Sequence, residues 1–490
     1  MSLTLCRADY LLPLAAPDRG LRIRDGYVLS EGESLVEVGP WSAEVEQRLV
    51  ATYGDRLQVV GREPGSDGFP RLRGALLPAF VKAHGHDHEQ PLIGIAKDEP
   101  LTAWLDHAVN PFTGFINREQ ESLTQALGCS PQLATYRMAR VADIHYGITA
   151  CMVHHCNHNK YRLAEIAQAN EAAGTTMIVA VGGQDRNYVA ELLDGPGEAV
   201  ARLDAALDIQ AGCARTTFCP GPDQLFSNSR RNLVPLKAWA REHGTLFHIH
   251  SSEEPNTTRW FQAEIEPGMT PVQFADSIGI LDEHSVLAHQ VNCGPDDLEI
   301  LARTGTRIAH NPLANTILGS GMPPIIEMIA AGIPVAISTD GSGSADNQNI
   351  LAAARLAAQY QKANHQDATL LPSQQLLEMI TTVPAQMLRL DQGELAPGRQ
   401  ADWVVVSLDR PNLVPTRLDN LMENLIWAAD GSEVDWVVAR GRVLKAGGRV
   451  LPFLDGTDPS EVMAAVQQLS ERFVEHQAQA PELRGTGAHH

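Results

Sequence analysis

The stretch Leu76-Leu-Pro-Ala-Phe-Val-Lys-Ala-His84-Gly-His86 joins a short apolar run to a pair of histidines. Seven more such runs follow, most of them rich in Val, Ile, Leu or Ala and too short for helices. Continuous apolar character is typical of parallel strands buried on both faces of a sheet. The eight runs are Ala75–Ala83, Ile148–His154, Thr175–Val181, Arg215–Pro220, Leu246–Ser251, Ser285–His289, Arg307–His310 and Pro334–Asp340.

Helical patterns separate these runs. Ser130-Pro131 has the form of an N-cap followed by a proline at the first helical position, and Pro323-Pro324 opens a segment that Gly332 ends. Repeated alternation of strand and helix predicts a parallel α/β fold. The span from His84 to Asp340 is close to the roughly 250 residues of a (β/α)8 TIM barrel. We therefore predict a TIM barrel, with a doubly wound sheet as the structural rival.

The two flanks of the chain differ from its middle. Both contain short alternating segments broken by turns, which indicates β-hairpins. We predict that the two ends combine into one small β-sandwich domain. The predicted division is 1–74 for the N-terminal part of the sandwich, 75–392 for the barrel, 393–455 for the C-terminal part of the sandwich, and 456–490 for a C-terminal helix and tail.

Composition excludes several classes of function. The 490 residues carry a formal charge of −21 and no basic run, which argues against a nucleic-acid partner and against anionic membrane surfaces. No apolar run reaches the roughly 20 residues that span a bilayer, and the N-terminus lacks the basic region of a signal peptide. The seven scattered cysteines contain no C-x-x-C, which indicates reduced thiols and a cytoplasmic protein.

Several of the 18 histidines gather at the predicted strand ends, where TIM barrels carry their catalytic groups. His84 and His86 stand two residues apart in an extended segment, so their side chains share a face. Imidazole and carboxylate ligands suit zinc, and iron or manganese less decisively. We therefore predict a divalent metal that activates water. The other polar residues at strand ends are His248, His250, Glu253, His289, His310, Asn311 and Asp340.

The ordered set of motifs resembles the amidohydrolase superfamily over roughly residues 1–455. It is most similar to the branch that contains the cytosine, guanine and S-adenosylhomocysteine deaminases and the triazine hydrolases. The motifs that carry the resemblance are Leu76 to His86, Gly147-Ile-Thr-Ala, His248-Ile-His250-Ser-Ser-Glu253, Val286-Leu-Ala-His289, Ala309-His-Asn-Pro-Leu-Ala-Asn315, Ser338-Thr-Asp340-Gly and Gly393 to Asp402.

The resemblance implies that His84, His86, His250 and Asp340 bind one divalent metal per chain, with zinc favoured over iron. Glu253 matches a proton-shuttling glutamate. His289 matches a histidine that hydrogen-bonds the activated water or the developing oxyanion. The ends of the third and fourth runs lack the lysine that bridges two metals in other members, which favours a mononuclear site.

The catalytic residues are thus predicted to be Glu253, His289 and Asp340. Side chains at other strand ends are predicted to contact substrate, although His154 and His155 are adjacent and at most one of them can face the pocket from its strand. His248 is expected to pack behind the ligands. The predicted substrate contacts are Trp104, His154, His155, His310 and Asn311.

The predicted reaction is hydrolytic deamination of an amino-substituted nitrogen heterocycle, of purine, pyrimidine, pterin or triazine type, with release of ammonia. One alternative is hydrolytic dehalogenation, or hydrolysis of another C–N bond in an amidine or cyclic amide, because one scaffold can support several reactions. Another is a non-catalytic binding protein, which the complete ligand set disfavours. The expected partner is a small heterocyclic molecule, and the resemblance implies a homo-oligomer, a dimer or tetramer.

Overall fold

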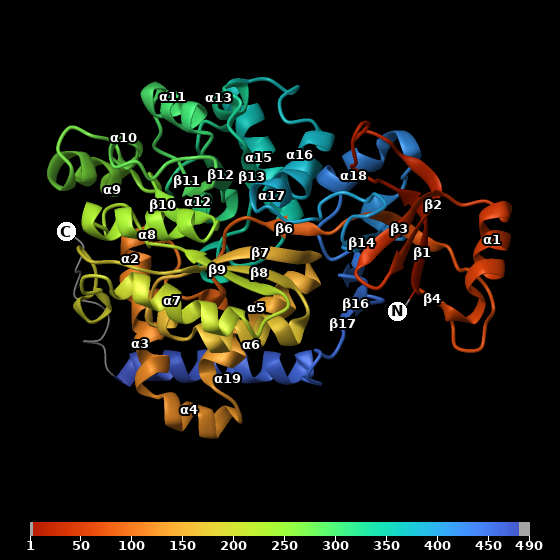
Figure 1. Cartoon of the computed structure of the whole chain (residues 1–490), viewed down its shortest axis with the longest axis horizontal. Coiled ribbons are helices and arrows are strands. Elements are labelled where there is room, and N and C mark those ends of the chain that lie inside the picture. Colours follow the sequence, from red (N-terminus) through yellow and green to blue (C-terminus); the bar gives the residue numbers. More distant parts are fainter. Residues whose placement is uncertain (1–2, 480–490) are drawn as a thin grey trace. The chain divides into compact units, whose positions relative to one another are not determined.

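The computed structural model describes residues 3–479, and the predicted tail beyond them lies outside the described residues. The chain forms two compact units, each assembled from distant parts of the sequence (Figure 1). The first contains the residues up to Val81, then Asp143–Ala150 and Asn349–Pro452. The second contains Lys82–Ala142, Cys151–Gln348 and the residues from Phe453 onward.

The two ends of the chain share one sheet of nine strands, in the order β17-β16-β15-β14-β5-β1-β2-β3, with β4 beside β1. The antiparallel pair β5–β14 joins the ends, with Leu76 opposite Val405. The two chain ends combine as the sequence predicts, whereas the second layer of a sandwich stays a prediction. The strands are β1 (Leu3–Leu11), β2 (Ile23–Glu31), β3 (Ser34–Pro40), β4 (Leu57–Val59), β5 (Leu72–Pro78), β14 (Trp403–Ser407), β15 (Val434–Ala439), β16 (Arg442–Ala446) and β17 (Arg449–Val450).

The remaining strands form two sheets of four, in the orders β6-β7-β8-β9 and β10-β11-β12-β13. Pairing is parallel between β8 and β9 and throughout β10 to β13. Almost every residue of these strands is buried, as their continuous apolar character predicts. The strands are β6 (Phe80–Lys82), β7 (Ile148–His155), β8 (Thr176–Val181), β9 (Thr216–Pro220), β10 (Phe247–Ser251), β11 (Ser285–His289), β12 (Arg307–His310) and β13 (Val335–Ile337).

The first predicted run, Ala75–Ala83, differs from the structure. It contains two strands, because β5 ends at Pro78 and β6 begins at Phe80. Proline has no N–H to donate to a ladder, so a strand tends to end there. Residues of one apolar run therefore belong to two different sheets. Each of the other seven runs corresponds to a single strand.

Helices connect the strands, and α5 and α13 begin where the proline signals predict. The α-helices are α1 (Ala43–Tyr53), α2 (Leu101–Trp104), α3 (Asn110–Arg118), α4 (Gln120–Leu127), α5 (Pro131–His145), α6 (Leu163–Ala173), α7 (Glu198–Gln210), α8 (Arg230–Glu242), α9 (Pro255–Trp260), α10 (Pro271–Ser277), α11 (Pro295–Thr304), α12 (Pro312–Ile317), α13 (Ile325–Ala330), α14 (Ser342–Ala345), α15 (Ile350–His365), α16 (Ser373–Met379), α17 (Thr382–Met387), α18 (Leu421–Trp427) and α19 (Pro459–Gln479). Among the shorter turns, a 3-10 turn spans Asp87–Leu92, and π-helical turns span Leu105–Val109 and Phe261–Ile265.

Helix α19 packs against a segment more than 350 residues earlier in the chain. Its Phe473 is fully buried and meets the ring of Phe112 edge-on, with centroids 5.2 Å apart. Ser470 Oγ donates a hydrogen bond to the Pro91 carbonyl at 2.8 Å. In Figure 1, α19 (blue) runs beside α3 and α4 (orange). The helix thereby supports the chain that directly follows His86.

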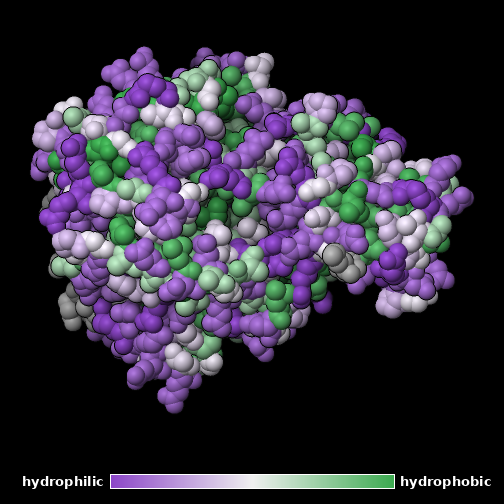
Figure 2. Space-filling view, in the orientation of Figure 1, coloured by the Kyte–Doolittle hydropathy of each residue, from purple (hydrophilic) through white to green (hydrophobic). Residues whose placement is uncertain are grey.

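The face of the molecule seen in Figure 2 is mainly hydrophilic. Figure 2 shows purple, hydrophilic residues over most of the visible face, with hydrophobic residues in small groups between them. Among the described residues, the most exposed large apolar residue is Val414, at 67%. Within residues 3–479, no helix combines the length and the apolar character that crossing a membrane requires.

A fully buried ion pair yields the first prediction. Lys160 Nζ lies 2.9 Å from Asp194 Oδ1, both side chains have no exposure, and Asp194 also bonds Arg202. Asp194→Leu should cost about 3–5 kcal/mol, because it removes the carboxylate from a buried ammonium. Lys160→Met should cost less, because Asp194 keeps Arg202.

Urea unfolding of the two variants checks this order. Equal losses, or a larger loss for Lys160→Met, would contradict the prediction.

Candidate active site

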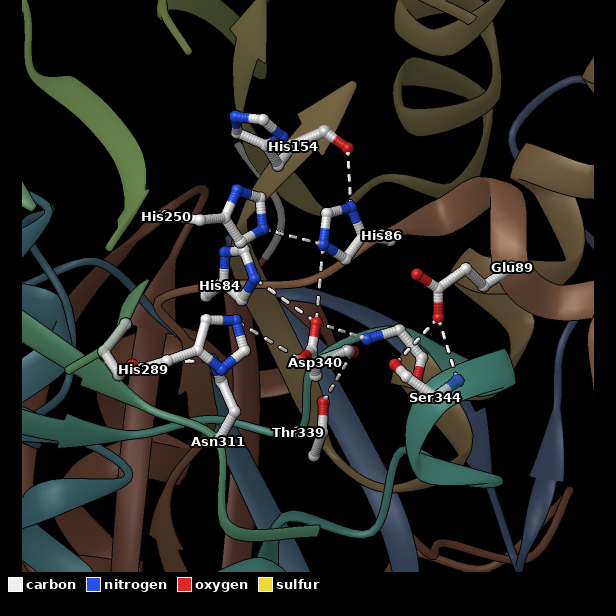
Figure 3. Close-up of polar contacts among 12 residues, drawn as sticks. His84, His86, Glu89, His154, His250, His289, Asn311, Thr339, Asp340 and Ser344 are labelled. Atoms are coloured by element: carbon white, nitrogen blue, oxygen red, sulfur yellow. Dashed lines mark hydrogen bonds and ion pairs between the residues drawn. The ribbon is translucent and has the colours of Figure 1, made fainter. Parts of the chain in front are cut away.

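The parallel register brings the carboxyl ends of several strands together. In the β10–β11 pair, His250 stands beside Ala288, and Ser251 stands beside His289. Asp340 lies just beyond the end of β13, and His84 and His86 follow β6. Side chains from four strand ends therefore meet at one point (Figure 3).

The predicted metal ligands form one cluster. His84 Nε2 lies 3.2 Å from Asp340 Oδ1, and His86 Nε2 lies 3.5 Å from the same oxygen. The Nε2 atoms of His86 and His250 are 3.1 Å apart. Figure 3 shows the three rings and the carboxylate turned toward one another. The structure thus brings together all four residues that the resemblance names.

The outer ring nitrogens of two of these histidines bond to backbone carbonyls. His86 Nδ1 lies 3.2 Å from the His154 oxygen, and His250 Nδ1 lies 2.7 Å from the Asp223 oxygen. A carbonyl can only accept, so each Nδ1 carries the proton. In each neutral ring, the lone pair is therefore on Nε2, which faces the cluster.

His84 is fixed through a second histidine. His248 Nδ1 donates to the Val286 carbonyl at 2.8 Å, so its Nε2 is an acceptor. His84 Nδ1 lies 2.7 Å from that Nε2 and donates to it. The lone pair of His84 is thus also on Nε2, a fully buried atom that makes no hydrogen bond within the described residues.

This arrangement fits a divalent metal. Three imidazole lone pairs and a carboxylate oxygen converge with no hydrogen between them, and a bound cation would offset their repulsion. Burial lowers the pKa of His86 to about 3 and holds the pKa values of His84 and His250 well below their usual range. All three rings are therefore neutral, the form that binds metal. Donors of this type suit zinc.

The backbone at two strand ends is strained. His289 has φ of 73° and Asp340 has φ of 70°, in the left-handed region that non-glycine residues seldom adopt. Such strain is commonly found where surrounding contacts hold a functional side chain in place. At Asp340, the next amide donates to the side chain, since Gly341 N lies 2.9 Å from Oδ1.

Glu253 and His289 stand beside the cluster. His289 Nε2 lies 3.6 Å from Glu253 Oε2 and 3.7 Å from Asp340 Oδ2. The opposite side of the ring is held by Asn315, whose Oδ1 is 2.9 Å from His289 Nδ1. Burial raises the pKa of Glu253 to about 7. A carboxyl group with this pKa can gain and lose a proton near neutral pH.

A cavity of about 170 Å³ opens onto these residues. Trp104, a predicted substrate contact, lines it, and its buried Nε1 has no hydrogen-bond partner among the described residues. Much of the rest of the wall is apolar. It includes Leu101, Leu105, Val109, Phe226, Trp260 and Leu318.

His154 and His155 diverge, as their adjacency predicts. His154 Nε2 lies 3.3 Å from the Pro222 carbonyl, and its ring centroid is 4.5 Å from that of His250. His155 turns the other way, with Nδ1 3.0 Å from Asn159 Nδ2. Both side chains are fully buried, and neither lines the cavity.

His310 and Asn311 lie deeper than a substrate contact would. His310 is fully buried, and neither of its ring nitrogens is hydrogen-bonded within residues 3–479. Asn311 Nδ2 lies 3.4 Å from His289 Nδ1, so it contacts the back of that ring. Neither residue reaches the cavity wall.

Sequence reasoning missed several polar residues of the cavity, among them Glu89, Asp223 and Gln224. Gln224 Nε2 donates to Glu253 Oε2 at 3.4 Å. Glu89 Oε2 accepts from both the amide and the Oγ of Ser344, at 3.0 and 2.9 Å. The available signal was position, because Glu89 lies three residues after His86, and Asp223 and Gln224 follow the end of β9.

Residues 75–444 match the model of the amidohydrolase family. The chain belongs to this family. It is therefore a hydrolytic enzyme, and its histidine and aspartate cluster occupies the strand ends where the sequence motifs of the family stand.

Curated relatives match over most of their length. The chain is 32% identical over 436 residues to a 5-methylthioadenosine/S-adenosylhomocysteine deaminase of Haloarcula marismortui, covering 87% of this chain and 91% of the relative. It is 28% identical over 437 residues to a 5'-deoxyadenosine deaminase of Methanothermobacter thermautotrophicus, covering 86% and 94%. Among solved structures, a zinc-bound adenosine deaminase from Xanthomonas campestris has a TM-score of 0.80 at 21% identity, covering 96% and 98%. The likeness of this amidohydrolase to that structure indicates a TIM-barrel-type fold.

The link from His84 to His248 yields the second prediction. His248→Leu should weaken zinc binding about 10- to 100-fold, because the partner that orients a metal-binding imidazole is lost. His248→Gln should weaken it less, because a glutamine oxygen can accept from His84 Nδ1.

Competition with a chelator measures both affinities. Zinc binding by His248→Leu that equals that of the unchanged protein would show that His248 does not orient a ligand.

Proposed function

We propose that this amidohydrolase is a metal-dependent deaminase of an amino-substituted nitrogen heterocycle. Water replaces the exocyclic amino group, and ammonia leaves. The observation that carries the proposal is the placement of Glu253 and His289 beside a four-donor cluster at the end of one cavity. Curated relatives named as 5'-deoxyadenosine and 5-methylthioadenosine deaminases make adenine nucleosides the first substrates to test.

His84, His86, His250 and Asp340 would hold one divalent metal, and zinc is the first candidate. When bound, the metal supplies Lewis acidity that lowers the pKa of water into the neutral range. The convergent lone pairs and the unbonded His84 Nε2 support this assignment. Zinc-bound relatives of the same fold are consistent with it.

The chain's own carboxylates move the protons. Asp340 accepts a proton from the attacking water at its carboxylate. Glu253 donates a proton to the ring nitrogen next to the amino-bearing carbon, which makes that carbon more electrophilic. Its pKa of about 7 keeps part of the population protonated at neutral pH. The proton taken from water then passes to the amino nitrogen. Ammonia leaves as the carbonyl forms, and the proton of the added hydroxyl returns to Glu253.

His289 orients the oxygen that adds to the ring. Its Nε2 faces both Glu253 and Asp340, so it lies at the centre of the polar side of the cavity. The Asn315 amide fixes the ring plane. The apolar wall around Trp104 and Leu318 excludes water from the far side of a bound ring.

We further propose that β6 to β13 close into one (β/α)8 barrel. A parallel bridge between Gln224 and His250 links the chain after β9 to β10. At the other junction, the Ala83 amide donates to Ser338 Oγ at 2.8 Å. The proposed barrel spans residues 75–392, and the proposed terminal sandwich is built from 1–74 and 393–455. We also propose a cytoplasmic location and a dimeric or tetrameric assembly.

Glu253→Gln tests the reaction. It should lower ammonia release from the best substrate about 10²- to 10⁴-fold, because glutamine cannot carry the proton. Metal content should stay near one per chain, because Glu253 is not a proposed ligand. Glu191→Gln, which removes a carboxylate that is 58% exposed, is the matched control.

The measurements are ammonia release over a panel of aminated heterocycles, and metal analysis of each variant. No ammonia from any member of the panel would overturn deamination. Unchanged turnover by Glu253→Gln would overturn its role.

The hydrogen bond from Gln224 to Glu253 predicts how the pH dependence of the reaction changes when Gln224 is replaced. Its hydrogen bond stabilises the charged form of Glu253 and so lowers the pKa of Glu253, against the larger effect of burial. Gln224→Leu removes this bond and should raise that pKa. Because the protonated carboxyl acts as the acid, the alkaline limb of kcat/KM should move to higher pH.

A pH profile of kcat/KM for both proteins decides the point. A limb that stays in place or moves to lower pH would show that Glu253 is not the acid.

A further inference from the structure

We propose that the substrate bears no negative charge, and that Glu89 binds an N–H edge of a neutral or cationic heterocycle beside the reacting centre. This inference rests on the proposed deaminase function and narrows its substrate class. It excludes nucleotides and carboxylated heterocycles as good substrates. It follows from the charges that line the cavity and from the geometry of one carboxylate.

The cavity is lined by carboxylates and by no cationic side chain. Among the described residues that line it, none is lysine or arginine. The carboxylates are Glu89, Asp223, Glu253, Glu254 and Asp340. The described wall therefore offers an anionic group no positively charged lysine or arginine side chain.

Nearby buried cations are engaged elsewhere. Lys160 pairs with Asp194 at 2.9 Å, and Arg140 Nη2 donates to Asp87 Oδ1 at 2.5 Å. Both cations have their own carboxylates, and a third buried cation, Lys82, donates to Gln348 Oε1 at 2.8 Å. None of the three lines the cavity. A phosphate or carboxylate on a substrate would therefore find no arginine or lysine on the described cavity wall.

Most of the lining carboxylates have protein partners. Glu254 caps α9 by accepting from the amide and the Oγ1 of Thr257, at 2.7 and 2.8 Å. Glu253 accepts from Gln224, and Asp340 belongs to the metal cluster. These three groups have structural or catalytic roles, and Asp223 accepts a hydrogen bond from the Cys156 thiol. The second oxygen of Glu89 is therefore the acceptor without an assigned role.

Glu89 is buried but only half satisfied. Glu89 is 3% exposed, and its Oε2 accepts both hydrogen bonds from Ser344. No hydrogen bond from residues 3–479 reaches Oε1. A carboxylate oxygen of Glu89 lies within 4.8 Å of ring nitrogens of His86 and His88. In Figure 3, the second oxygen of Glu89 is turned toward the histidine cluster.

The backbone leaves room for this carboxylate. A Cβ at Gly341 would stand 1.9 Å from Glu89 Oε2, and a Cβ at Gly343 would stand 3.2 Å from Glu89 Cβ. Only a residue without a side chain can occupy position 341 in this arrangement. The carboxylate is therefore held in place before a ligand arrives, which reduces the entropy lost on binding.

An oriented carboxylate oxygen next to the reacting centre selects hydrogen-bond donors. Ring N–H, amino and amidine groups of heterocycles supply such donors, and their flat faces fit the wall formed by Trp104, Phe226 and Leu318. An anion in the same place would meet like charge in a medium of low dielectric.

A charge series on one scaffold tests the inference on the zinc-loaded protein. The panel of aminated heterocycles first identifies the best neutral substrate, and then its amine-bearing and phosphate-bearing derivatives are compared. For adenosine these are 5'-amino-5'-deoxyadenosine and adenosine 5'-monophosphate. We expect kcat/KM for the phosphate to be at least about 100-fold lower than for the other two. A phosphate that reacts as fast as the neutral compound would overturn the inference.

Glu89→Gln tests the residue. It should raise KM for the neutral substrate about 10- to 100-fold, because the N–H edge that all three substrates share loses its charged acceptor. The rise should be larger for the amine-bearing substrate and smaller for the phosphate, because the variant also removes a negative charge from the cavity wall. Glu191→Gln, which removes an exposed carboxylate, should leave all three unchanged. Equal effects of Glu89→Gln on all three substrates would show a merely structural role.

Dissociation constants measured on zinc-loaded Glu253→Gln separate this inference from the proposed reaction. If the phosphate binds more weakly than the other two compounds but the unchanged protein releases no ammonia, deamination is overturned and the charge selectivity stands. If dissociation constants and turnover are the same for all three compounds, the charge selectivity is overturned.

Discussion

Three imidazole rings with fixed tautomers are the constraint on which the site depends. Backbone carbonyls of His154, Asp223 and Val286 each accept an N–H, and the last of them acts through His248. A free imidazole can place its proton on either nitrogen, and two neighbouring rings would then share a hydrogen bond instead of facing each other with lone pairs. The carbonyls prevent this, because they have no proton to give. The secondary structure that positions these carbonyls therefore also determines the chemistry of the cluster.

The same constraint explains what the sequence could predict. His84 and His86 share a face because the side-chain period of an extended chain is two, and this is a local property. The parallel strands are equally local, since each is a short apolar run that must be buried. The carboxyl ends of parallel strands meet at one edge of a sheet. The positions of His250, His289 and Asp340 at successive strand ends therefore predict that their side chains lie close together. The sheet formed by both chain ends followed from hairpin patterns of the same local kind.

The cavity wall could not be predicted in this way. Whether His310 or Trp104 faces the cavity depends on loops whose paths are set by distant contacts, and His310 proves to be fully buried while Trp104 lines the cavity. Glu89 carries no motif of its own, and its role follows from Ser344 and Gly341, more than 250 residues later. The division of the run Ala75–Ala83 between two sheets could not be predicted either. Hydropathy indicates that a residue is buried, but it does not indicate to which sheet the residue belongs.

Helix α19 has a consequence for the order in which the enzyme is made. Its residues leave the ribosome after more than 450 others, yet Ser470 and Phe473 contact the chain between Pro91 and Phe112, which is made early. The strand ends that carry the histidines are all synthesised before that contact can form. The segment after His86 therefore spends most of translation without its final packing partner. Packing around the segment after His86 is therefore completed only after all the strand ends that carry the histidines have been made.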